Sequence, residues 1–440
     1  MPRLPWRGRR RGIWPALVLI AVGVGIWWLV HPPQKQDWLE WPAYDASDPM
    51  TARLQPTGRD LLWSRAAMRG STRLFLSNHP EVLPLTECTL WRDEASGPGE
   101  VRYLAYLCHI NSDDHPVYLG LLVENAGNAP FTVTGEEVAT QSAPNRSIRE
   151  MWHQQTRVGR RNAYAELSGQ LFKPLPQLEA PAGTSRRILV WKMPASSTLG
   201  ARVRLILRGA DGPVRCRLST VWAKSEKRLT IGLSLIPHGR SQQRGSWLSA
   251  EVVADNRDDP FDLAGKEREG ETVRCLRLCQ PVYQGEKKVG YSRDVVYTRE
   301  RSFNPAEALP NIGTYGARTH VELHVKNSSN REQTVELYLR YPDRRITGYY
   351  IGAATVYAYD GKRWTPRETR AVNLGSMTFT NFITGTKTQD RHWFTSALAS
   401  YPVPAGGRLV IPLDVTHDYP AMLPLGIVLR KAGNIQDNRD

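Results

Sequence analysis

Residues 319–326 read THVELHVK, a run in which polar and apolar side chains alternate residue by residue. Because successive side chains of a β-strand point to opposite faces, this run predicts a strand with one face in a core. His320 and His324 would share the polar face, about 13 Å apart at roughly 3.3 Å per residue. That separation is too large for a shared metal ion, so we expect no metal site here.

Strand-like segments recur along most of the chain at spacings of roughly 10–15 residues, with Gly, Pro and Asn between them. Many short strands with such turns are typical of β-sandwiches. We therefore predict a mainly β chain with two β-sandwich-like domains, at residues 71–213 and 214–435. Residues 147–171 differ, because the stretch 147–158 lacks Gly and Pro and carries mixed charge, which predicts a helical segment.

Residues 13–30 read IWPALVLIAVGVGIWWLV and contain no charge, close to the roughly 20 residues that cross a bilayer core. Five arginines fall within residues 3–11, so residues 1–12 are expected to form a cytoplasmic tail. We predict a retained transmembrane helix at 13–30 and a spacer at 31–70, with the bulk of the chain extracytoplasmic. A cleaved signal peptide would need a small-residue cleavage site, and WWLVHPP offers none.

The chain has 440 residues, 41% of them hydrophobic, and a formal net charge of +15. Removing the five N-terminal arginines leaves +10 on the remainder. A basic exported region favours anionic neighbours such as wall polymers, lipid head groups or acidic polysaccharide. Nucleic acid is not expected as a partner, because the region is predicted to be exported.

The five cysteines suggest one disulfide. Cys88 and Cys108 are equidistant from Pro98 in a Gly-Pro-Gly turn signal, so a hairpin centred there would place them face to face. Cys275 and Cys279 are four residues apart on an expected strand, too far to bond each other. One of them could pair with Cys216.

The sequence contains no GxSxG, HExxH, P-loop or CxxC pattern. We therefore assign no catalytic, cofactor-binding or metal-binding residue and expect no cofactor. The basic run RVGRR offers Arg157, Arg160 and Arg161 as candidate anion contacts, with a solvated helix face as the alternative.

Several phrases resemble a family of exported proteins from Gram-positive spore-formers, often found with a copper-amine-oxidase-like N-terminal domain. These phrases are RLFLSNHPE (73–81), VR (101–102), HIN (109–111), LLVEN (121–125), RGSW (244–247), NIGTYG (311–316), GYYIGA (348–353) and LPL (423–425). The copper-amine-oxidase-like module itself is not seen here. The resemblance implies a bacterial envelope protein, and it carries no catalytic residues over to this chain.

These observations favour a membrane-anchored envelope protein without enzymatic activity. Its β domains would bind an anionic wall polymer or another envelope protein, or serve as a structural scaffold. The alternative is a wall-active glycan hydrolase, or another envelope enzyme, whose carboxylates are brought together only by the fold.

Overall fold

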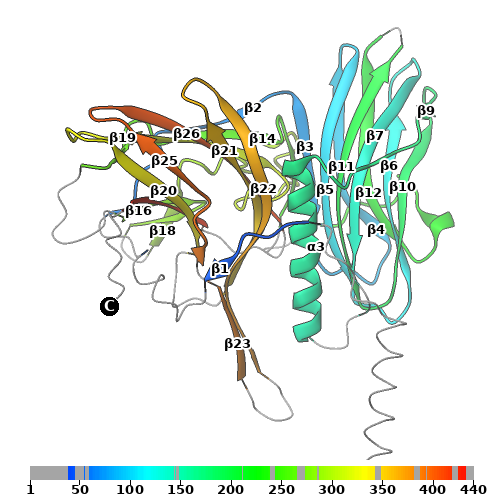
Figure 1. The fold of residues 1–440 in the computed structure, drawn as a ribbon. Helices are drawn as coiled ribbons and strands as arrows, with labels where there is room; N and C mark the ends of the chain where they lie inside the picture. The colour runs from blue at the N-terminus through cyan, green and yellow to red at the C-terminus, as the bar shows by residue number, and fades with distance from the viewer. Residues whose placement is uncertain are drawn as a thin grey trace, which may run out of the picture. The chain divides into compact units, whose positions relative to one another are not determined.

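The computed structural model describes residues 38–44, 54, 59–142, 144, 148–210, 212–237, 243–264, 273–284, 287–341, 348–380, 387–392, 394–418 and 425–432. Residues from Glu40 onward belong to one compact unit. Within it the chain is mainly β, with one long helix, α3 (Ile148–Ser168), and a single 3-10 turn, η1 (Glu226–Arg228), among the described residues (Figure 1).

The first sandwich packs a seven-stranded sheet against a four-stranded sheet. Across the larger sheet the order is β13 (Gln243–Trp247), β3 (Thr72–Asn78), β5 (Glu100–Asn111), β11 (Ser197–Gly209), β7 (Phe131–Gln141) and β8 (Lys173–Pro174), and β9 (Leu178–Ala180) also pairs with β7. The smaller sheet runs β10 (Ser185–Met193), β6 (Val117–Asn125), β12 (Val214–Ala223) and β4 (Cys88–Gly97). Their facing sides bury one core that includes Trp91, Tyr103 and Leu121.

The second sandwich packs an eight-stranded sheet against a six-stranded sheet. The larger sheet runs β2 (Arg65–Arg69), β14 (Glu251–Asp255), β19 (Arg318–Lys326), β26 (Arg408–His417), β21 (Gly348–Tyr359), β22 (Trp364–Thr380) and β23 (Lys387–His392), and β15 (Phe261–Asp262) pairs with β19. The smaller runs β1 (Ala43–Tyr44), β24 (Phe394–Thr395), β20 (Gln333–Arg340), β27 (Leu425–Lys431) and β16 (Val273–Leu278), and β25 (Ala399–Val403) pairs with β20. Strands β17 (Pro281–Gln284) and β18 (Lys287–Tyr291) form a separate pair. Leu323, Leu413 and Leu337 lie in the core between the two sheets.

A third core joins the two sandwiches. The chain passes between them twice, from β2 to β3 and from β13 to β14, and these passes lie side by side because β2 pairs with β14 and β3 pairs with β13. Leu76, Tyr106, Trp247, Val252 and Ile351 from both sandwiches pack together there. Helix α3 contacts β11 of the first sandwich and β21 and β22 of the second (Figure 1).

The alternation in residues 319–326 is confirmed. Strand β19 covers this run, and its residues alternate between buried and half-buried along the whole strand. The helical segment expected within 147–171 is α3. Strand β12 begins at Val214, the predicted start of the second domain, and it pairs with β4 and β6 of the first sandwich.

The membrane segment requires a correction. No helix among the described residues combines the length and the apolar character needed to cross a membrane. The predicted span 13–30 and the tail 1–12 lie outside the described residues. The fold class expected from the sequence, which included a transmembrane helix, is corrected on this finding to a mainly β chain of several sheets. Part of the expected spacer 31–70 also belongs to these sheets, as β1 and β2.

The hairpin predicted around Pro98 is wrong in its pairing. Strands β4 and β5 flank that turn, but β4 belongs to the four-stranded sheet and β5 to the seven-stranded sheet. The chain therefore crosses from one layer of the sandwich to the other at this turn. Apolar residues of both strands are buried in the core between the two layers. The residues of the turn do not indicate which layer each strand joins.

Candidate functional site

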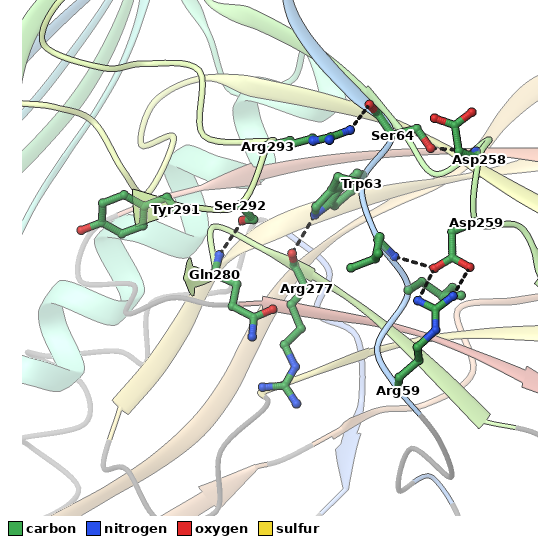
Figure 2. Close-up of a pocket in the computed structure, with 12 residues that line it drawn as sticks. Arg59, Trp63, Ser64, Asp258, Asp259, Arg277, Gln280, Tyr291, Ser292 and Arg293 are labelled. Atoms are coloured by element: carbon green, nitrogen blue, oxygen red, sulfur yellow. Dashed lines mark hydrogen bonds and ion pairs between the residues drawn. The ribbon is translucent and has the colours of Figure 1, made fainter. Parts of the chain in front are cut away.

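An open cavity of about 630 Å³ lies beside the segment that precedes β2. This segment, residues 59–64, is held in place by backbone hydrogen bonds: Leu61 N donates to Cys275 O at 2.8 Å, and Ser64 N donates to Asp255 O at 2.8 Å. Residues 258–259 after β14, the end of β16 and residues 291–293 complete the wall (Figure 2). The cavity thus combines four separate segments of the chain.

An ion pair closes one side of this cavity. Arg59 donates from Nη1 to Asp259 Oδ2 at 2.8 Å and from Nη2 to Asp259 Oδ1 at 2.7 Å, a bidentate pair (Figure 2). The Leu62 amide donates to the same carboxylate at 2.9 Å. The Asp259 carboxylate therefore links the segment before β2 to the loop after β14.

Trp63 forms the buried floor. Its side chain is almost fully covered, and its indole Nε1 donates to the Arg277 carbonyl at 2.7 Å (Figure 2). Next to it the Leu62 side chain is 61% exposed. Tyr291, at the end of β18, is half-buried and also lines the cavity. The cavity therefore has an apolar and aromatic surface beside its charged groups.

Two further guanidinium groups reach the cavity. Arg277 Nε lies 2.7 Å from Asp60 Oδ2, and Arg293 Nη1 donates to the Ser64 carbonyl at 3.2 Å. Burial raises the pKa of Asp60, and the positive charge of Arg277 opposes that rise. A guanidinium has five N–H donors, so these contacts leave donors on Arg277 and Arg293 for a ligand.

The cavity lining consists of charged, polar, aromatic and apolar side chains. The cavity lining includes neither histidine nor cysteine. Its two serines are engaged: Ser64 Oγ accepts from the Asp258 amide at 2.7 Å, and Ser292 Oγ accepts from the Gln280 amide at 2.9 Å and donates to Asp294. Among the described residues neither serine hydrogen-bonds to a histidine, the usual base of an activated serine.

The predicted anion contacts do not belong to this cavity. Arg157, Arg160 and Arg161 lie half-buried on α3. Arg160 forms an ion pair with Glu40 at 2.5 Å, and burial lowers the pKa of the Arg160 guanidinium. Arg161 donates from Nη1 to Thr140 Oγ1 at 3.4 Å. Arg160 and Arg161 therefore attach α3 to neighbouring segments of the fold.

The predicted disulfide between Cys88 and Cys108 is not formed. Both thiols are free and buried. Cys88 belongs to the core of the first sandwich, whereas Cys108 lies in the core that joins the two sandwiches. Cys216, Cys275 and Cys279 are also free and buried. Burial raises the pKa of Cys88 to about 11 and the pKa of Cys275 to about 12, which keeps these groups as thiols.

One group of side chains has the donors of a metal site. Asp113, Asp114 and His115, between β5 and β6, bring ligand atoms within 4.8 Å of one another. His115 pairs with both carboxylates, which raise the pKa of its imidazole. Because Asp114 and His115 are exposed and these contacts already satisfy their charges, we assign no metal to them.

Sequence reasoning missed Arg59, Arg277 and Arg293. Arg59 is more than 200 positions from Arg277 and Arg293, and none of the three lies in a recognisable motif. The apolar pair Leu62-Trp63 is the most distinctive sequence feature of the cavity, but only the fold shows that these two residues line it.

No family model matches this chain, and no curated protein matches it. Solved structures show only remote likenesses. The N-terminal CBM22-1–CBM22-2 tandem domain from Paenibacillus barcinonensis Xyn10C is 8% identical, with 86% of this chain and 100% of that chain covered and a TM-score of 0.13. Tripeptidyl peptidase 2 is 10% identical, with 81% and 27% covered and a TM-score of 0.19. The PBSX exported protein XepA is 8% identical, with 90% and 98% covered and a TM-score of 0.12. Such low scores support no conclusion about fold or function.

Proposed function

We propose that this chain is a non-catalytic binding protein of the bacterial cell envelope, and that its ligand is an anionic wall polymer. The observation that carries the proposal is the cavity of about 630 Å³ whose lining includes Arg277, Arg293, Leu62 and Tyr291. Guanidinium forks match the oxygens of phosphate and carboxylate groups and stay charged at every relevant pH. The envelope location rests on the family resemblance.

The charge of the whole chain supports the same ligand class. In the cavity lining, which holds three arginines and two aspartates, Arg59 is paired with Asp259 and Arg277 is paired with Asp60. The chain as a whole carries +15, so a polyanion is also attracted before contact. Leu62 and Tyr291 can pack against the less polar faces of a polymer unit, as in most ligand sites.

Binding of the full-length protein to purified Gram-positive walls tests this proposal. The double variant Arg277→Gln/Arg293→Gln should bind walls about tenfold more weakly, because it removes two charge-assisted contacts. Arg215→Gln, an exposed arginine of β12 outside the cavity, is the matched control and should bind as the parent does. Walls stripped of anionic polymer should retain little protein.

Salt gives a second readout. The Debye length falls from about 10 Å at 0.1 M to about 3 Å at 1 M, so release is expected near 0.5 M salt. Equal binding by the double variant and by Arg215→Gln would contradict the cavity as the site. Retention on stripped walls at high salt would contradict the anionic ligand.

The alternative of a glycan hydrolase needs two carboxylates in one cleft, one of which protonates the leaving group. Glu136 and Glu166 do line one cavity. Arg204, however, pairs with Glu136 at 2.9 Å and with Glu166 at 3.1 Å. Both carboxylates are therefore engaged by the same guanidinium. We therefore favour binding over hydrolysis.

A further inference from the structure

Two further cavities lie where the two sandwiches meet. One, of about 520 Å³, is lined by residues of β5, β7, β11 and α3 together with Glu251 and Arg318. The other, of about 150 Å³, is lined by residues of β19, β21 and β26 together with the same Glu251 and Arg318. Because the cavities share these two lining residues, they are neighbours, and we call them together the junction groove.

Arg204 organises the larger end of the junction groove. Its Nη1 donates to Glu136 Oε1 at 2.9 Å. Its Nη2 donates to the Glu166 backbone carbonyl at 3.0 Å and lies 3.1 Å from the Glu166 carboxylate oxygen Oε1. The guanidinium also lies 4.1 Å from the centre of the Phe172 ring. These contacts fix two carboxylates and one guanidinium on a strand, a helix and a neighbouring strand.

Asp414 organises the smaller end. Its side chain is 1% exposed and accepts hydrogen bonds from His320 Nδ1 at 2.6 Å, from the Tyr357 hydroxyl at 2.6 Å and from Arg318. These donors hold the pKa of Asp414 below its ordinary value despite burial. The contact with Asp414 fixes the position of the His320 imidazole. The imidazole is also partly exposed, and His320 lines the small cavity.

Glu251 lies between these two clusters, in the wall that both cavities share. It is exposed, and its carboxylate makes no ion pair with any residue that the structure describes. Its oxygens are therefore available to accept hydrogen bonds from a ligand, between two clusters that are already rigid.

The charges of the junction groove balance. It is lined by four arginines and four carboxylates: Arg69, Arg102, Arg204, Arg318, Glu136, Glu166, Glu251 and Asp414. A charged ligand would meet attraction and repulsion in equal measure. A neutral chain of hydroxyl groups would not, because each hydroxyl both donates to a carboxylate and accepts from a guanidinium.

We propose that the junction groove binds a neutral oligosaccharide, with Glu251 as its principal hydrogen-bond acceptor. Arg204, Glu136 and Glu166 are held by one another, as are Arg318 and Asp414, so these groups lose little conformational entropy when the ligand binds. This site is separate from the anionic cavity, and its residues are not among those that line that cavity.

Isothermal titration calorimetry of the full-length protein with neutral hexasaccharides of glucose, xylose or N-acetylglucosamine tests the proposal. At least one should bind, with an affinity that is unchanged between about 0.05 and 0.5 M salt because no net charge is involved. Glu251→Ala should weaken this binding about tenfold. Glu332→Ala, which removes an exposed carboxylate outside the groove, is the matched control.

The outcomes separate this site from the anionic cavity. Arg277→Gln/Arg293→Gln should leave hexasaccharide binding intact, and Glu251→Ala should leave wall-polymer binding intact. Absence of binding to every neutral hexasaccharide would overturn the junction groove as a sugar site, and so would equal affinities for Glu251→Ala and Glu332→Ala. Thermal unfolding of each variant shows whether a loss of binding reflects a loss of fold.

Discussion

At the scale of single residues, two buried histidines make stability depend on pH. Burial lowers the pKa of His109 to about 4 and that of His417 to about 3. Both stay neutral in the folded state, whereas the unfolded chain takes up these protons below about pH 6.5. The free energy of unfolding is therefore highest above pH 6.5, where the histidines are neutral in both states. It decreases as pH falls towards 4, because only the unfolded chain binds the protons. Each of the two histidines should therefore lower the free energy of unfolding by about 2 kcal/mol at pH 5 relative to pH 7.5.

Urea unfolding at pH 7.5 and pH 5 measures this loss. His417→Gln removes one titrating group, so its stability should fall by about 2 kcal/mol less than that of the parent over this range. His153→Gln, at an exposed histidine of α3, is the control and should leave the difference nearly unchanged. Identical pH dependences for the parent and His417→Gln would show that His417 takes up its proton over the same pH range in the folded and unfolded states, which contradicts a lowered pKa.

At the scale of elements, strands β4 and β5 separate the two cysteines that the turn signal had paired. The strands lie in different sheets, and Cys88 and Cys108 face different cores. All five thiols are free and buried. We therefore expect no reaction of the native protein with Ellman's reagent, and five reactive thiols after unfolding without reductant. Fewer than five thiols in the unfolded protein would reveal a disulfide and contradict the strand placement.

At the scale of the whole molecule, local sequence patterns predicted where strands and helices lie better than they predicted which strands pair with each other. Alternation in residues 319–326 located β19, and the Gly- and Pro-free stretch located α3. The turn at Pro98 gave the positions of two strands but not their sheets, because sandwich strands choose partners through a shared core. The candidate site was beyond reach for the same reason. Arg59, Arg277 and Arg293 line the same cavity only because the segment before β2 forms a backbone hydrogen bond to β16.

Hydrogen–deuterium exchange of the full-length protein, with and without purified teichoic acid, tests the anionic cavity most directly. If the polymer binds there, exchange should slow at residues 59–64 and 291–293, which line the cavity, and stay unchanged at residues 157–161 of α3. The same protection should be absent from Arg277→Gln/Arg293→Gln. Protection confined to α3, or no protection at 59–64 under conditions where the polymer binds, would contradict the cavity as the binding site.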